Sequence, residues 1–237
     1  MLSAQPHIED LVASERLRPL RRVEYDWMVG QGFFSQERVE LLDGFIVEMS
    51  PQGTRHAGAV RRLTHLLIKE LGDRAYVRIQ LPFAASDVSE PEPDVAVVPP
   101  GDEDAAHPSS AFLIIEVADS SLKRDQLVKT RIYAGTAVPE YWVVDVANDT
   151  IEIRTTPRDR AYGAVRVARP GETIRLQAFP DVVVGAQMWT TSPRAAAVAS
   201  YMTSDRVGWG WTAASTSWAV ASDVMASDIS AMRSVTP

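Results

Sequence analysis

The spacing of apolar residues along the chain predicts three helices. In residues 56–71 the apolar positions recur every three or four residues, and Gly72 follows the last of them, which predicts a helix that ends there. Residues 121–135 predict a second helix with Gly135 as its stop. Residues 23–34 predict a third, shorter helix.

Short apolar runs between turn residues predict that strands are in the majority. The segment RVELLDGFIVEMSP predicts a hairpin, because two apolar-rich runs flank Asp43-Gly44, a dipeptide that tolerates the positive φ angles of a tight turn. The remaining strands are expected in the segments AYVRIQLPF, DVAVVPP, AFLIIEV, EYWVVDV, TIEIRT, AYGAVRVA and ETIRLQ. Together these elements predict an α/β fold, with a mixed central sheet flanked by helices and additional C-terminal strands.

Length and composition suit one domain with additions. The chain has 237 residues, of which 46% are hydrophobic, which is enough to bury a core. We expect an N-terminal extension at residues 1–19, a domain at residues 20–190 and a weakly ordered tail at residues 191–237. The tail is rich in Ala, Ser and Thr and has no clear helical or strand period.

Several protein classes are excluded or disfavoured by composition. No apolar run approaches the roughly 18 residues of a membrane span, and the N-terminus lacks the apolar core of a signal peptide, so we expect a soluble, cytoplasmic protein. The absence of cysteine excludes disulfides, thiolate metal sites and cysteine nucleophiles. A net charge of −7 argues weakly against a protein that coats nucleic acid, but it allows an enzyme that contacts DNA through one local basic face.

Two acidic residues beside apolar runs are the first candidates for chemistry. Asp94 precedes the run VAVV, and Glu116 follows the run FLII. If the two strands are neighbours, about 5 Å apart, their carboxylates can share one ion. Mg²⁺ or Mn²⁺ is commonly held by one or two carboxylates together with water and substrate phosphate. Lys129, about two turns into the following helix, could point back over the strand end and orient the attacking water.

Each of these residues alone also has an ordinary structural explanation. Asp94 could mark the start of a strand at the surface. Glu116 could be a strand-end carboxylate that caps the next helix or pairs with Arg124, and Lys129 could be solvated. Only the combination of the three favours a site.

Six motifs in order resemble the Uma-two family of bacterial proteins, whose role is largely unknown. They are RVELLDGFIVEMSP, RHAGAVRRLTHLL, EPDVAVV, LIIEVADSS, KRDQLVKTRIYAGTAVPEYWVVDV and GETIRLQAFPDVVV, and they cover roughly residues 20–190. The family is placed by similarity in the restriction-endonuclease-like, PD-(D/E)XK superfamily. The resemblance implies a restriction-endonuclease-like core with Asp94 and Glu116 as metal ligands.

The resemblance also assigns two further catalytic residues. The superfamily pattern has a lysine two residues after the second acid, where this chain has Ala118. In this family the lysine is thought to have moved to the following helix, and Lys129 is the matching residue. Glu40 corresponds to the early acid of the superfamily, although strand alternation could equally turn it outward. His56 matches a histidine that the family usually carries, without a known role.

Other conspicuous residues favour structural roles. His56 and His65 lack a partner at metal-ligand spacing, so structural histidines are expected. Tyr141 and Trp142 lie at a strand start and are expected in the core, and Asp145 is expected to be a turn residue.

Two classes of function follow. The first is an Mg²⁺- or Mn²⁺-dependent endonuclease that hydrolyses DNA phosphodiester bonds, with Asp94 and Glu116 as ligands and Glu40 and Lys129 as further catalytic residues. The alternative is a non-catalytic module that keeps the nuclease fold and binds nucleic acid or protein. Hydrolysis of a different phosphodiester cannot be distinguished from the first by sequence. A homodimer would suit cleavage of both strands of a duplex, but no residue pattern shows one.

Overall fold

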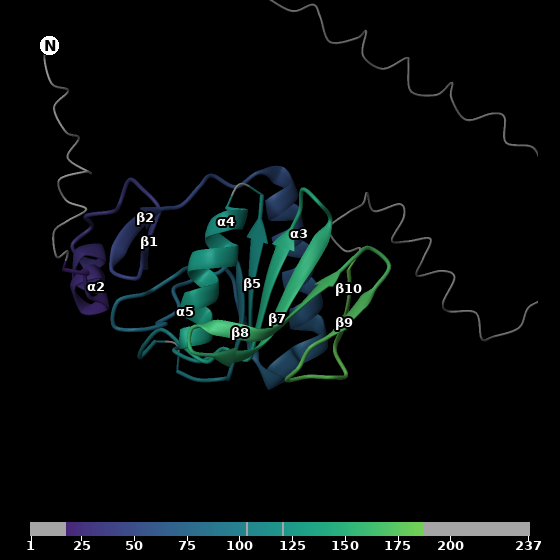
Figure 1. The fold of residues 1–237 in the computed structure, drawn as a ribbon. Coiled ribbons are helices and arrows are strands. Elements are labelled where there is room, and N and C mark those ends of the chain that lie inside the picture. The colour runs from purple at the N-terminus through teal and green to yellow at the C-terminus, as the bar shows by residue number, and fades with distance from the viewer. Residues whose placement is uncertain (1–17, 103, 120, 187–237) are drawn as a thin grey trace, which may run out of the picture. The chain divides into compact units, whose positions relative to one another are not determined.

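A six-stranded mixed sheet forms the centre of the structure (Figure 1). The computed structural model describes residues 18–186 except 103 and 120. The expected tail at residues 191–237 and nearly all of the expected N-terminal extension lie outside the described residues.

The sheet has the strand order β3-β4-β5-β6-β7-β8, and two separate hairpins, β1-β2 and β9-β10, accompany it. The strands are β1 (Val39–Leu42), β2 (Phe45–Glu48), β3 (Tyr76–Arg78), β4 (Val95–Val98), β5 (Leu113–Ala118), β6 (Glu140–Asp145), β7 (Thr150–Arg158), β8 (Ala161–Ala168), β9 (Thr173–Arg175) and β10 (Val183–Gly185). The helical elements are α2 (Arg22–Gly30), α3 (Thr54–Leu71), the 3-10 turn η1 (Gly72–Arg74), α4 (Leu122–Arg124), the π-helical turn η2 (Asp125–Lys129) and α5 (Thr130–Gly135).

Only β5 and β6 pair in parallel, and the other neighbours in the sheet pair antiparallel. Parallel neighbours need a crossover connection. Here the connection is the continuous helical segment α4-η2-α5, which lies on one face of the sheet while α3 covers the other (Figure 1). The crossover therefore carries helical side chains back over β5, the strand that contains Glu116.

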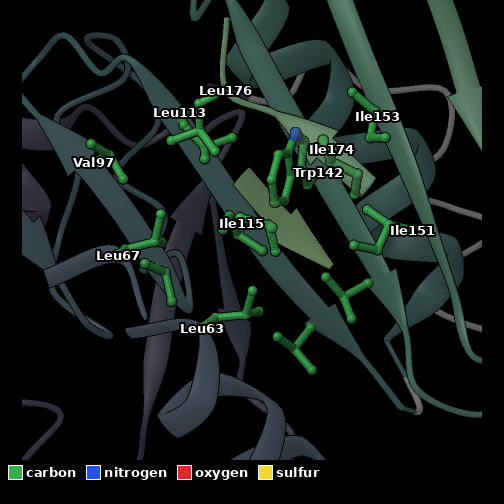
Figure 2. Packing of buried hydrophobic residues seen from close by; sticks show 14 of the residues in the cluster. Leu63, Leu67, Val97, Leu113, Ile115, Trp142, Ile151, Ile153, Ile174 and Leu176 are labelled. Atoms are coloured by element: carbon green, nitrogen blue, oxygen red, sulfur yellow. The ribbon is translucent and has the colours of Figure 1, made fainter. Parts of the chain in front are cut away.

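Alternate residues of the central strands enter two different cores. On β5, Leu113, Ile115 and Val117 belong to the core that includes α3, whereas Ile114 and Ala118 belong to the core that includes α5. Figure 2 shows the first core. Leu63 and Leu67 of α3 lie on one side of Ile115 in this view, and Trp142 and the β9 residue Ile174 lie on the other. Because both faces of β5 are buried, it is continuously apolar except at one position, Glu116.

The β1-β2 hairpin forms as its sequence predicts. Asp43 and Gly44 at its turn have φ angles of 47° and 87°. The hairpin is attached to the segment before β4, because Leu41 and Glu90 exchange two backbone hydrogen bonds of 3.3 and 2.8 Å. This attachment brings Glu40 toward the end of the sheet where β4 begins.

Most predicted elements are confirmed, with two differences. The strand expected in residues 75–83 is limited to β3, because Gln80 adopts a positive φ of 52° that breaks the extended backbone. Strand β10 was not expected as a separate element. Among the described residues no helix is long and apolar enough to cross a membrane.

Glu90, a buried acid outside the central sheet, lies close to Arg22 of α2. Glu90 is 4% exposed, and its Oε2 lies 3.6 Å from a guanidinium nitrogen of Arg22. Burial raises the pKa of Glu90 to about 7, with Asp26 adding to the increase and Arg22 opposing it. Glu90 therefore takes up a proton more readily in the folded chain than in the unfolded chain, where its pKa is near the ordinary 4.5.

This raised pKa predicts that stability falls as the pH rises. The contribution of Glu90 to the free energy of unfolding is fully present below its unfolded pKa of 4.5 and is lost as the pH rises to its folded pKa of about 7. We expect Glu90→Gln to flatten this dependence and to be more stable than the wild type at about pH 8, by on the order of 1–2 kcal/mol. Urea unfolding over a pH series measures it, with the exposed Glu70→Gln as control. Parallel pH profiles for wild type and Glu90→Gln would contradict the prediction.

Candidate active site

Strand pairing brings Asp94 and Glu116 together. Val95 at the start of β4 pairs with Ile115 of β5. Extending this antiparallel register by one residue sets Asp94 opposite Glu116, and directly opposite residues have their side chains on the same face. Both are buried, with exposed fractions of 7% and 3%. Two buried acids therefore lie side by side at one end of the sheet.

Asp94 is held by three hydrogen bonds from three parts of the chain. Its Oδ2 accepts the backbone N–H of Val117 at 2.8 Å and lies 3.0 Å from Nε2 of His56, while its Oδ1 accepts Nε2 of Gln80 at 3.2 Å. Burial by itself would raise the pKa of Asp94, but His56, the Val117 N–H and Lys129 outweigh it and lower the pKa. Asp94 is therefore a carboxylate at neutral pH.

Glu116 is held on one oxygen by two donors from the crossover helix. Lys129 Nζ lies 2.9 Å from Glu116 Oε1, and the Tyr133 hydroxyl donates to the same oxygen at 2.6 Å. Lys129 also lies 3.1 Å from Oε2 of Glu40, which accepts the backbone N–H of Glu92 at 3.2 Å. The ammonium group of Lys129 thus joins the hairpin to the central sheet.

A π-helical turn precedes and includes this lysine. The backbone N–H of Thr130 bonds to the carbonyl of Asp125, five residues earlier. The same carbonyl accepts the Thr130 hydroxyl at 3.1 Å and the Tyr141 hydroxyl at 3.0 Å. Such turns are rare and are often found at functional sites. In this helix the extra residue lies in η2, so that Asp125 and Lys129, its first and last residues, are both buried.

The charges around Lys129 are unbalanced. Burial alone would lower the pKa of Lys129, but Glu116, Glu40 and Asp125 raise it overall, so the side chain stays an ammonium ion. Burial raises the pKa of Glu116 well above its ordinary value; Lys129 opposes this, and Asp125, Asp94 and Glu40 add to it. Burial and the neighbouring acids therefore make the charged form of Glu116 costly, and positive charge beside it lowers that cost.

A small pocket opens onto three of these acids, Asp94, Glu116 and Asp125. Its volume is about 50 Å³, enough for a few water-sized groups and too small for a nucleotide. Lys129 and His56 also line it, together with the more exposed residues 49–52 and Arg124 at its rim.

These residues fit a divalent cation bound by two carboxylates. Among the described residues, no group of three or more His, Cys, Asp or Glu side chains is arranged to hold a metal ion. A complete protein cage is not required, because Mg²⁺ is often bound by one or two carboxylates plus water and substrate phosphate. Asp94 and Glu116 provide this donor set, and Glu40 Oε1 is a further buried acceptor without a hydrogen bond.

The four site residues expected from sequence lie in one cluster. Glu40, Asp94, Glu116 and Lys129 are all buried. Lys129 contacts Glu116 and Glu40, and Asp94 lies opposite Glu116 in the extended register of β4 and β5. Some structural alternatives are wrong: Glu116 lies within β5 and pairs with Lys129 instead of Arg124, and Lys129 is not solvated. Glu40 does not face outward, because the whole of β1 is buried.

Three further residues belong to the cluster. His56, expected to be structural, is buried and hydrogen-bonded to Asp94 and also lines the pocket, whereas His65 is exposed. The available signal for Tyr133 and Asp125 was their spacing of four residues on either side of Lys129. Tyr141 and Trp142 are in the core as expected, and Asp145 accepts hydrogen bonds from the turn after β6.

Comparisons with known proteins bear on the family and the fold of the chain. The family model Uma2, described as "Putative restriction endonuclease", matches residues 24–188. Among solved structures, the chain is similar to one from Anabaena variabilis ATCC 29413, described as "a putative nuclease belonging to DUF820". The identity is 15% and the TM-score is 0.55, and the match covers 65% of this chain and 90% of the other. This likeness shows the fold alone. No curated protein sequence matches the chain.

The burial of Lys129 between acids predicts a large stability cost for its removal. We expect Lys129→Met to lower the free energy of unfolding by about 3–5 kcal/mol, because buried carboxylates would be left unpaired. The matched control is Lys123→Met, an exposed lysine of the same helical segment, with an expected change within about 0.5 kcal/mol. Urea denaturation of metal-free protein measures both, and equal costs would contradict the assigned ion pairs.

Proposed function

The chain belongs to the Uma2 family, and from this premise we propose that it is a divalent-metal-dependent endonuclease that hydrolyses phosphodiester bonds in DNA. The observation that carries the proposal is the pair Asp94 and Glu116, two adjacent buried acids that open into one small pocket beside Lys129. Two adjacent buried carboxylates repel each other, so a cation bound between them would stabilise the pair.

Asp94 and Glu116 would hold the metal ion, which we propose to be Mg²⁺ or Mn²⁺. Restriction-endonuclease-like families generally use divalent metals, and oxygen donors suit these two ions. When bound, such an ion supplies positive charge that stabilises the transition state and lowers the pKa of a bound water. Burial raises the pKa of Glu116, so a bound cation would favour its carboxylate form.

Lys129 would act as a fixed positive charge and not as a base. Its contacts with Glu116 and Glu40 keep the ammonium group protonated and immobile. An ammonium ion so placed can donate a hydrogen bond to the attacking water or to a phosphate oxygen. Glu40 would then have a supporting role, because its Oε2 lies 3.1 Å from the ammonium group of Lys129 and its Oε1 lies 4.0 Å from Nε of Arg124.

The sugar-phosphate backbone of the DNA would have to lie across the mouth of the pocket. Since about 50 Å³ is too small for a nucleotide, the scissile phosphate would approach the metal ion from the mouth of the pocket. Arg124 lies at the rim, donates to the carbonyl of Glu48 at 3.2 Å, and has a buried Nε without a hydrogen-bond partner. Its guanidinium group can offset phosphate charge locally, even though the net charge of the chain is −7.

The test is cleavage of single- and double-stranded DNA with and without divalent metal. We expect cleavage with Mg²⁺ or Mn²⁺ and none with a chelator. Asp94→Asn and Glu116→Gln should each reduce the rate by about 100-fold or more, because the charge at the reacting phosphate is lost. Asp181→Asn, an exposed residue 64% accessible at its side chain, is the control and should cleave like the wild type.

Two results would argue against the proposal. Full activity of Asp94→Asn or Glu116→Gln, in preparations free of contaminating nuclease, would mean that the pocket is not the active site. A wild-type protein that neither cleaves DNA nor gains thermal stability from millimolar Mg²⁺ or Mn²⁺ would favour the alternative of a non-catalytic binding module.

A further inference from the structure

The two acids of the pocket share one hydrogen-bonding pattern. On each carboxylate a single oxygen receives two strong donors: Lys129 and Tyr133 on Glu116 Oε1, and His56 and the backbone N–H of Val117 on Asp94 Oδ2. A carboxylate oxygen accepts about two hydrogen bonds, so each of these oxygens is saturated.

The second oxygen of each acid is much less engaged. Asp94 Oδ1 accepts one bond of 3.2 Å from Gln80, and no hydrogen bond within the described residues reaches Glu116 Oε2. A metal ion entering the pocket therefore meets one free or weakly bonded oxygen on each acid. The donors fix which oxygen that is, because rotation of either carboxyl group would break two bonds.

We propose that Tyr133 and His56 are positioning residues, which anchor one oxygen of Glu116 and of Asp94 and so orient the other oxygen toward the metal ion. This inference rests on the proposed function. It assigns roles to two side chains on different elements, α5 and α3, that are not themselves metal ligands in this scheme.

The hydroxyl of Tyr133 is unusual among the buried tyrosines. Tyr25 and Tyr162 donate to backbone carbonyls, those of Val39 and Val138, which is the ordinary way to satisfy a buried hydroxyl. Tyr133 donates instead to the carboxyl group that lines the pocket, at 2.6 Å and with no exposure to solvent. Its ring also packs against Phe83 and Tyr141, so its position is fixed on both sides.

His56 provides the equivalent contact from the other side of the sheet. It lies in the first turn of α3, is 8% exposed, and directs Nε2 at Asp94. Because Asp94 Oδ2 is an acceptor, Nε2 is the protonated nitrogen in this contact. Partners that orient ligand carboxylates typically contribute a factor of about 10–100 to metal affinity or activity.

The experiment is calorimetric titration of the full-length protein with Mn²⁺ alone. Tyr133→Phe removes only the hydroxyl, and we expect it to raise the Kd for Mn²⁺ by about 10-fold or more. Tyr162→Phe is the matched control: it also loses one buried hydroxyl bond, to the carbonyl of Val138, but Tyr162 does not line the pocket, so this variant should bind Mn²⁺ like the wild type. The melting temperatures of the two metal-free variants should fall by similar amounts.

His56 gives an independent test through a conservative replacement. His56→Gln keeps an N–H donor that can reach Asp94, whereas His56→Ala removes it. We expect His56→Ala to weaken Mn²⁺ binding by about 10-fold or more and His56→Gln to restore most of that loss. A purely structural role would lower the melting temperature of His56→Ala without changing the Kd of the folded protein.

The outcomes separate this inference from the proposed function. Wild-type binding of Mn²⁺ with an unchanged Kd in both Tyr133→Phe and His56→Ala would overturn the positioning roles and leave the metal site intact. Failure of the wild type to bind Mn²⁺, with or without DNA, would overturn both. Weaker binding in Tyr133→Phe but not in Tyr162→Phe, together with recovery in His56→Gln, would support the inference.

Discussion

The burial of several carboxyl groups around Lys129 is the constraint on which the rest of the site depends. In an interior of low dielectric constant, an unpaired carboxylate costs several kcal/mol, so acids are buried only where positive charge or donors meet them. Lys129 meets two of them at once, Glu116 at 2.9 Å and Glu40 at 3.1 Å. The hairpin, the central strand β5 and the crossover helix must therefore keep fixed relative positions.

The architecture satisfies this constraint with ordinary elements and one irregular turn. The parallel pairing of β5 and β6 requires a crossover, and the crossover carries Lys129 and Tyr133 back over Glu116. The π-helical turn is stabilised where it forms, because Thr130 and Tyr141 both donate to the carbonyl of Asp125. A local irregularity is thereby supported by contacts from the same helix and from β6.

The fold and the adjacency of Asp94 and Glu116 could be predicted because their signals are local. Glu40 was indicated only by the family resemblance. Asp43-Gly44 determines a hairpin, and the acids beside two neighbouring apolar runs meet when those strands pair. The π-helical turn could not be predicted, since it depends on Tyr141, a residue on another element. The contact of His56 with Asp94 joins α3 to the residue before β4, and no spacing of residues in the sequence indicates it. Glu40 stayed ambiguous because both faces of β1 are covered, so alternation carried no information.

The small residue at position 118 bears on which element supplies the positive charge beside Glu116. Ala118 lies two residues after Glu116 on the same buried face, and Ile132 and Tyr133 pack in the core that includes it. A side chain of the size of lysine at this position would displace part of that core. The charge comes instead from Lys129 on the crossover segment, so any motion of that segment relative to β5 would move the charge away from the acid.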